Sequence, residues 1–168
     1  MKPLALLFPA LLLVSCAGYQ LGGVKPASLA RVQSIAVPMF SNATLHPRAE
    51  ALATSAVANA IVLDGTYRIA AIDHADAVLK GKLTNITYAP IRNTRLNTLH
   101  PEELSNMVTL RWSLTDAKDP TKVLASGSST GRSQLYVADN LQTARNNALP
   151  DALERAAQAL VSTLSNGY

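Results

Sequence analysis

Apolar and polar positions along the chain predict strands separated by two helical segments. Strands are expected at 32–40, 66–70, 78–88, 104–115 and 123–137. The alternation is clearest in 104–115, where Val108, Leu110, Trp112 and Leu114 take every second position. Pro38 indicates an edge strand or a strand end, and Gly81 indicates a bulge or a close approach of another group. Residues 89–103, with Pro90 and Pro101, are expected to form a long loop.

The two helical segments follow a different period. The first is expected to begin near Pro47 and to end before Gly65. Its apolar stripe comprises Leu52, Ala56, Ala60 and Leu63, with Val57 and Ile61 alongside. The second is capped by Asp139 or Asn140 and runs to about Ser165, with Pro150 expected to kink or split it. Its apolar face comprises Leu149, Leu153, Ala156, Leu160 and Leu164.

This order of elements predicts an α+β fold. Two helices should pack on one face of a roughly four-stranded sheet that is mostly antiparallel or mixed. The chain has 168 residues, which is enough for one domain with a substantial core. We therefore expect a single domain over residues 32–168.

The N-terminal segment predicts export and lipid attachment. Residues 1–15 carry Lys2 and then an apolar run that is too short to cross a bilayer, which is typical of a signal peptide. The run ends in Leu13-Val14-Ser15-Cys16, which resembles the bacterial lipobox, in which a diacylglyceryl group is attached to the cysteine thiol. An ordinary signal peptide with an incidental cysteine is the alternative.

Cleavage before Cys16 would leave a lipidated tether over residues 16–31. Several glycines and a proline (Gly18, Gly22, Gly23 and Pro26) interrupt regular structure in this segment. Residue 17 is Ala rather than the Asp that resembles an inner-membrane retention signal. We therefore expect the mature protein on the periplasmic side of the outer membrane, held by its acyl chains.

Composition argues against several classes of function. The net charge of +4 lacks the dense basic clustering of a nucleic-acid binder. One cysteine excludes a disulfide framework, and His46, His74 and His100 lie outside metal-ligand spacings. There is no phosphate-binding loop and no recognisable nucleophile–base set. We therefore expect no enzymatic activity, no metal and no cofactor.

Three blocks of sequence resemble one lipoprotein family. They are Cys16-Ala17-Gly18-Tyr19-Gln20-Leu21, the block from Ile35 to Thr44 followed by Pro47, and the block from His74 to Gly81. Together they resemble the lipopolysaccharide-assembly family LptE, although many members go directly from the cysteine to glycine. The resemblance implies a non-enzymatic plug in the lumen of the outer-membrane β-barrel LptD. It also implies assistance to barrel folding and to delivery of lipopolysaccharide to the outer leaflet.

Two groups of residues are candidates for contact under this interpretation. The basic residues Lys80, Lys82, Arg92, Arg95 and Arg132 lie in stretches without acidic residues. They suit the phosphates of a lipid A-like glycolipid, and the alternative is a solvated face whose charges prevent strand edges from pairing. Ser126, Ser128 and Thr130 suit the polar wall of a barrel, and a mobile edge strand is the alternative.

A second family resemblance leaves another function open. The block from Ile35 into the first helix also resembles the start of domains similar to the TolB N-terminal domain. That resemblance implies a periplasmic lipoprotein that activates a cell-wall synthase or forms part of a secretion pore.

Overall fold

The computed structural model describes residues 25–93, 101–137 and 140–167, which form an α+β fold as predicted. The strands are β1 (Ser34–Ala36), β2 (Ser41–Asn42), β3 (Arg68–Ile69), β4 (Ala77–Asn93), β5 (Pro101–Asp116) and β6 (Val123–Tyr136). The helices are α1 (Ala49–Asp64), α2 (Leu141–Asn166) and the short 3₁₀ turns η3 (Ala27–Leu29) and η4 (Ile72–His74). The sheet thus has six strands rather than about four.

The sheet is mixed. Its order is β3-β1-β4-β5-β6, and β2 pairs with β4 beside β1. The short strands β1, β2 and β3 pair in parallel, whereas β4, β5 and β6 form an antiparallel meander. The strand predicted at 66–70 is confirmed as β3, whereas β2 was not predicted, because its two residues are too few for a periodic pattern to be visible.

The expected loop at 89–103 is wrong at both ends. Strand β4 continues to Asn93 and β5 begins at Pro101, with Arg92 opposite Glu103 in the register. The register shifts between Pro90 and Arg92, so an irregular pairing lets the strand pass a proline that lacks an N–H group. The two strands therefore form a long hairpin.

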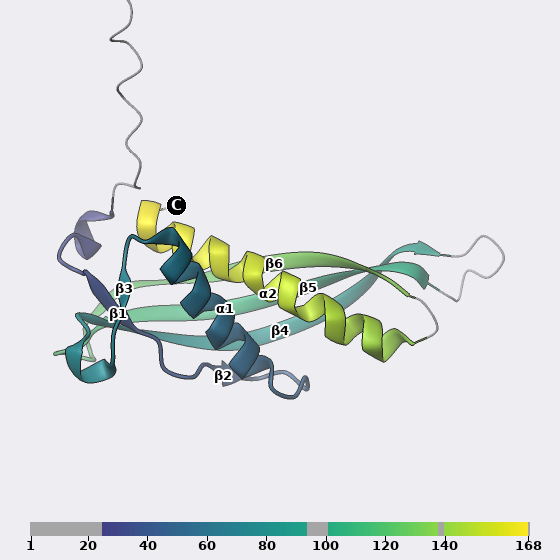
Figure 1. The fold of residues 1–168 in the computed structure, drawn as a ribbon, viewed down its shortest axis with the longest axis horizontal. Helices are drawn as coiled ribbons and strands as arrows, with labels where there is room; N and C mark the ends of the chain where they lie inside the picture. The colour runs from purple at the N-terminus through teal and green to yellow at the C-terminus, as the bar shows by residue number, and fades with distance from the viewer. Residues whose placement is uncertain (1–24, 94–100, 138–139, 168) are drawn as a thin grey trace, which may run out of the picture.

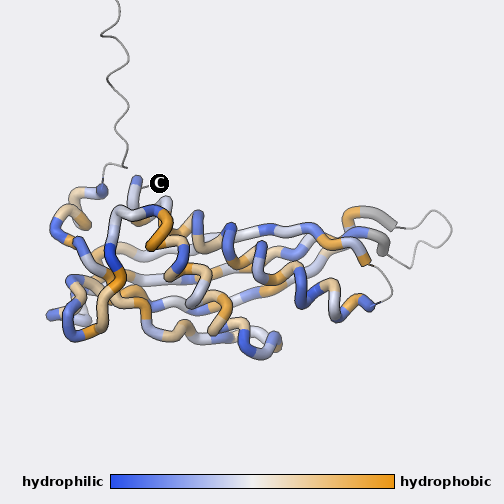
Figure 2. Tube along the Cα trace, viewed as in Figure 1, coloured by the Kyte–Doolittle hydropathy of each residue, from blue (hydrophilic) through white to orange (hydrophobic). Residues whose placement is uncertain are grey.

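Both helices lie on the same face of the sheet, and the β4–β5 hairpin runs along the long axis of the molecule (Figure 1). The buried stripe of α1 consists of Ala49, Ala53, Val57 and Ile61. The expected stripe was right for Val57 and Ile61 and wrong for Leu52, which is 40% exposed, and for Leu63, which is 84% exposed. An alanine-rich helix packs through its small side chains, which bring its backbone close to the sheet. Figure 2 shows that the C-terminal end of α1 is hydrophobic.

Helix α2 runs unbroken through Pro150, so the proline does not split it. Pro150 is exposed, which places its ring on the solvent side of the helix. The predicted apolar residues (Leu149, Leu153, Ala156, Leu160 and Leu164) are all buried. The Asn140 side chain caps the helix by accepting a 3.1 Å hydrogen bond from the Thr143 N–H. This helix supplies most of the cover for β5 and β6.

The segment that precedes β1 packs on the domain. Leu29 of η3 is buried in the main core, and the Lys25 ammonium lies 4.5 Å from the centre of the Tyr67 ring. Lys25 Nζ also donates a 2.9 Å hydrogen bond to the Val32 carbonyl. Among the helices that the structure describes, none is long and apolar enough to cross a membrane.

Candidate functional site

The sheet face opposite the two helices is the strongest candidate for a functional surface. Alternation along β4, β5 and β6 sends one set of mostly apolar side chains toward the helices and the intervening, mostly polar set away from them. We call the second set the open face. It consists of Lys80, Lys82, Asn85, Thr87 and Ala89 of β4, Ser105, Met107, Thr109, Arg111 and Ser113 of β5, and Ser126, Ser128, Thr130, Arg132 and Gln134 of β6.

The pairing register arranges the open face in rows across the strands. One row is Lys80–Ser113–Ser126 and the next is Lys82–Arg111–Ser128. Two further rows are Asn85–Thr109–Thr130 and Thr87–Met107–Arg132. Side chains directly opposite each other in such rows are close enough to act on the same ligand. The structure therefore places six of the predicted residues on one surface: Lys80 and Lys82 of β4, and Ser126, Ser128, Thr130 and Arg132 of β6.

The positive charge is concentrated at one end of the open face. Lys82 lies directly opposite Arg111, and Lys80 lies in the adjacent row. These three side chains line a shallow depression of about 330 Å³, together with Ser41 and Ser113. Two like charges opposite each other weaken strand pairing, so this arrangement costs stability. It is suited to an anionic group, which would be bound by charge-assisted hydrogen bonds.

Arg111 was not among the residues predicted from the sequence. Its signal was present, because it lies between the buried residues Leu110 and Trp112 in the clearest alternating strand. The alternate positions of the same strand, Thr109, Arg111 and Ser113, point away from the core, and this pattern is the signal that could have identified Arg111.

Among the described side chains, the part of the face around Arg132 is less basic, because Arg132 lies opposite Met107. The hydroxyls of Ser126, Ser128 and Thr130 make no hydrogen bond to another described residue and remain available to a partner.

Three predicted positions are not described at the level of side chains. Arg92 lies in β4 opposite Glu103, but only its backbone placement is described. Arg95 and Cys16 lie outside the described residues. Their roles remain predictions.

The polar groups on the helix side have structural partners. Trp112 is 5% exposed, as predicted for a core residue, and its Nε1 donates a 3.0 Å hydrogen bond to Ser129 Oγ. The Tyr67 hydroxyl donates a 2.7 Å hydrogen bond to the Leu164 carbonyl. Burial, reinforced by the Asp64 charge, raises the pKa of Tyr67 to about 12. These bonds join the sheet to itself and the β3 region to α2.

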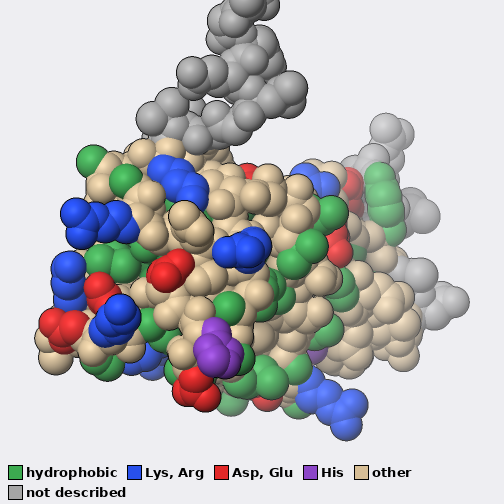
Figure 3. All heavy atoms as spheres, turned by 60° about the vertical axis from the view of Figure 1, so that its left-hand side comes forward, with side chains coloured by type: hydrophobic (Ala, Val, Ile, Leu, Met, Phe, Trp, Pro, Cys, Tyr) green, Lys and Arg blue, Asp and Glu red, His purple; other side chains and the backbone are tan. Residues whose placement is uncertain are grey.

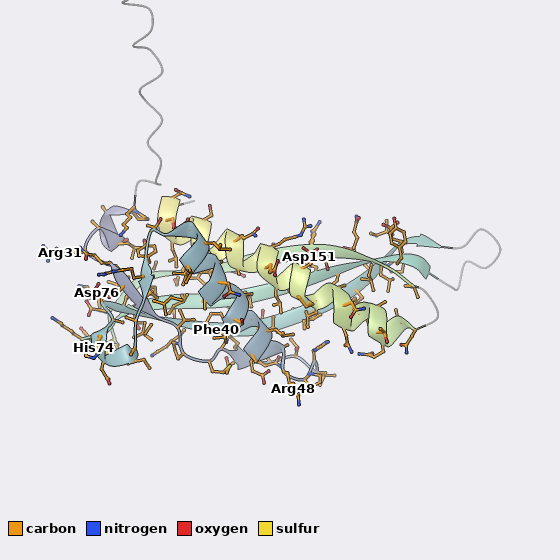
Figure 4. The ribbon with its side chains drawn as sticks, in the orientation of Figure 1. Arg31, Phe40, Arg48, His74, Asp76 and Asp151 are labelled. Carbon is orange, nitrogen blue, oxygen red and sulfur yellow. The ribbon has the colours of Figure 1, made fainter. Side chains whose placement is uncertain are left out.

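The Asp-His-Ala-Asp sequence at 73–76 forms a turn, as predicted. Asp73 and His74 belong to η4, and Asp76 turns toward β1. Hydrogen bonds from the Gln33 N–H and from the hydroxyl and N–H of Ser34 lower the pKa of Asp76. Figure 4 shows His74 and Asp76 near Arg31, at the end of the molecule where acidic and basic side chains intermingle in Figure 3. Within the described part of the chain, no group of three or more His, Cys, Asp or Glu residues is placed to hold a metal.

Comparison with known proteins gives a family match over most of the chain. The family model described as LptE, lipopolysaccharide-assembly, matches residues 32–164. No curated protein matches the sequence.

Several solved structures resemble the fold. A Xanthomonas campestris protein of family DUF330 has 18% identity and a TM-score of 0.57, covering 79% of this chain and 84% of its own. A minor lipoprotein from Acinetobacter baumannii has 10% identity and a TM-score of 0.50, covering 79% of this chain and 91% of its own. The PelC dodecamer from Paraburkholderia phytofirmans has 23% identity and a TM-score of 0.46, covering 81% of this chain and 94% of its own.

Proposed function

Since the chain belongs to the LptE family of lipopolysaccharide-assembly proteins, we propose that it is an outer-membrane lipoprotein that supports the LptD barrel. In this proposal the protein is anchored through Cys16 on the periplasmic side. It plugs the barrel, assists its assembly and helps to insert lipopolysaccharide into the outer leaflet. It acts by binding and not by catalysis.

The opposition of Lys82 and Arg111 carries the lipopolysaccharide part of the proposal. The repulsion between these two cations weakens the β4–β5 pairing, and an anionic ligand would offset it. Lys80 adds a third cation within the same depression. Phosphate groups on the glycolipid supply the matching charge.

The barrel would contact the hydroxyl-rich part of the open face. The interior wall of a large outer-membrane barrel is polar and wet, so it makes hydrogen bonds more readily than apolar contacts. Ser126, Ser128 and Thr130 offer small polar side chains on a strand that no described helix covers on that face.

A photo-crosslinking amino acid tests the barrel contact in cells. Placed at Ser128 on the open face, it should form a covalent adduct with LptD. Placed at Glu154, on the outer surface of α2, it should give a much weaker adduct. Purification in mild detergent should also recover LptD with the tagged protein. Recovery of a cell-wall synthase or of a homo-oligomeric ring instead would contradict the proposal.

A charge-matched pair of triple variants tests lipopolysaccharide binding. Lys80, Lys82 and Arg111 are changed to Ala in one variant, and Lys118, Lys122 and Arg155 in the other. Each charge-assisted contact contributes roughly 1 kcal/mol or more, so the first variant should bind lipopolysaccharide at least about tenfold more weakly at low salt. The second should bind almost normally. Equal losses in the two variants would show that only net charge matters.

A further inference from the structure

A second pocket lies on the helix side of the sheet, separated from the open face by the strands. It has a volume of about 260 Å³ and forms where three segments meet. These are the loop before α1, including Thr44 and His46, the middle of β4 at Tyr88, and the start of α2 at Gln142 and Arg145. The pocket is therefore assembled by tertiary packing from parts of the chain about a hundred residues apart.

Polar atoms in this pocket lack partners. His46 Nε2, Tyr88 Oη and Arg145 Nε are all buried and make no hydrogen bond within the described part of the chain. Asn106, which lies opposite Tyr88 in the register, also has both amide atoms without a partner, but it is fully buried and does not line the pocket. Native proteins leave few buried polar atoms unsatisfied, and three such side chains around one pocket indicate a site that a ligand completes.

The pocket carries one positive charge, on Arg145, that no described neighbouring residue balances. The Arg145 guanidinium carbon lies 4.8 Å from the centre of the Tyr88 ring, which fixes the orientation of the guanidinium group. Among the residues that the structure describes, no acidic one lines the pocket or occupies the first turn of α2. Glu50, the nearest acid on the adjoining loop and helix, accepts a 2.9 Å hydrogen bond from Asn42 instead. A single guanidinium matches a singly charged carboxylate better than a phosphate dianion.

The other polar groups favour a peptide as the source of that carboxylate. His46 Nδ1 lies 3.2 Å from the Pro47 carbonyl, to which it donates in the neutral ring. That tautomer leaves Nε2 as an acceptor beside the donors of Arg145 and Tyr88. A carboxylate alone has no hydrogen to give to such an acceptor, whereas a peptide that carries one also has backbone N–H groups.

An unpaired strand edge lies next to the pocket. On the edge of β4 away from β5, β2 pairs at Lys82 and Leu83, and the Ala43 N–H donates to the Leu83 carbonyl at 2.9 Å. Among the described residues, no strand pairs with that edge from Asn85 onward. An extended segment can add to such an edge and place alternate side chains on one face.

We infer that the pocket lined by His46, Tyr88 and Arg145 receives the aspartate or glutamate side chain of an extended partner segment that lies along the free edge of β4. This inference does not depend on the proposed function of the open face. It concerns the opposite side of the sheet and different residues.

The test uses the full mature chain in detergent micelles, with the Arg145 Nε–H signal followed by nitrogen-15 NMR. The probes are glutamate blocked at both ends, glutamine blocked in the same way, and inorganic phosphate. We expect saturable shifts with blocked glutamate in the millimolar range, none with blocked glutamine, and weaker binding of phosphate. A five-residue extended peptide with a central glutamate should bind at least fivefold more tightly than blocked glutamate.

Three variants separate the site from general charge effects, read out on backbone amide signals around the pocket. R145Q should abolish binding, and Y88F, which removes only a hydroxyl, should weaken it severalfold. R155Q should bind normally, because Arg155 lies on the same helix and pairs with Asp151 at 3.1 Å. If R145Q does not fold, the inference is tested by the weaker binding expected of Y88F and by the wild-type titrations. Tighter binding of phosphate, no saturation, or equal affinity of peptide and blocked glutamate would overturn the inference.

Discussion

Ser34 and Asp76 hold β1 against the start of β4 through reciprocal hydrogen bonds. The Ser34 hydroxyl donates to the Asp76 carboxylate at 2.9 Å and accepts from the Asp76 backbone N–H at 3.1 Å. The same carboxylate accepts hydrogen bonds from the backbone N–H groups of Gln33 and Ser34. One side chain therefore fastens two strands whose own pairing is only two residues long.

We expect Asp76→Ala to lower the free energy of unfolding by about 1 kcal/mol at pH 7, since exposed hydrogen bonds to a charged group contribute modestly. Because the pKa of Asp76 is lowered in the folded protein, its charged carboxylate stabilises the fold at pH values above the ordinary pKa of an aspartate. This stabilisation is lost as the pH falls through the pKa of the folded state. Urea unfolding at neutral and acidic pH should show less acid sensitivity in the variant. Asp73→Ala, in the same turn, should leave both measurements unchanged.

The repulsion between Lys82 and Arg111 makes a prediction about stability as well as binding. Lys82→Thr should raise the free energy of unfolding by about 0.5 kcal/mol, because it removes a like charge directly opposite Arg111. Lys80→Thr is the matched control, because Lys80 lies opposite Ser113. Thermal unfolding at low salt measures the stability of both variants relative to the wild type. An equal gain in the two variants would indicate strand propensity rather than repulsion.

Gly131 lies so close to α2 that a Cβ atom there would clash with the Ala152 carbonyl oxygen and the Ala156 nitrogen. Because these are backbone atoms, the helix itself would have to move. Gly131→Ala should therefore destabilise the protein by about 2 kcal/mol or more in chemical denaturation. Thr130→Ala, on the opposite face of the same strand, should cost less than about 1 kcal/mol.

Tyr67→Phe removes the buried hydrogen bond to Leu164 and should cost about 1–2 kcal/mol. The Tyr67 pKa of about 12 lies above the ordinary value, so its contribution is complete at lower pH and is lost as the pH rises toward 12. Denaturation at pH 8 and pH 11 should show this loss in the wild type and not in the variant. Tyr136→Phe, which changes a residue that is 68% exposed, should have little effect at either pH.

Cys16→Ala should prevent lipid attachment and cleavage of the signal segment. The protein should then run at a higher mass and lose its tight association with the outer membrane, because acyl chains supply most of that attachment. Globomycin treatment of the wild type should likewise block processing. A wild-type protein whose Cys16 thiol is free in mass spectrometry would contradict the lipobox interpretation.

Long regular patterns were predictable from the sequence, and short or ambiguous ones were not. The apolar face of α2 and the alternation in β5 were confirmed, because each repeats over several turns or pairs. The buried face of α1 was assigned only partly correctly, since that helix is apolar on most sides and its period favours no single face. The two-residue strand β2 depends on its pairing with β4 and leaves no local signal, whereas β3 falls within the strand predicted at 66–70.

Of the two candidate sites, the open face was partly predictable from the sequence and the pocket was not. Lys80, Lys82 and Ser128 share a face because positions two apart along a strand point the same way, a relationship visible in the sequence. The pocket around Arg145 had no such signal. His46, Tyr88 and Arg145 come together only when α2 folds back over the hairpin, so their proximity is a property of the tertiary structure.

The two ends of the domain would lie at different distances from the membrane under the proposed lipid attachment. The described chain begins beside the end of α2, where Gly167 approaches Pro26, whereas β4 ends at Asn93 and β5 begins at Pro101 at the opposite end (Figure 1). A strand of 17 residues spans roughly 55 Å at about 3.3 Å per residue. If acyl chains fasten the first end, the length of β4 and β5 places Asn93 and Pro101 well away from the point of attachment.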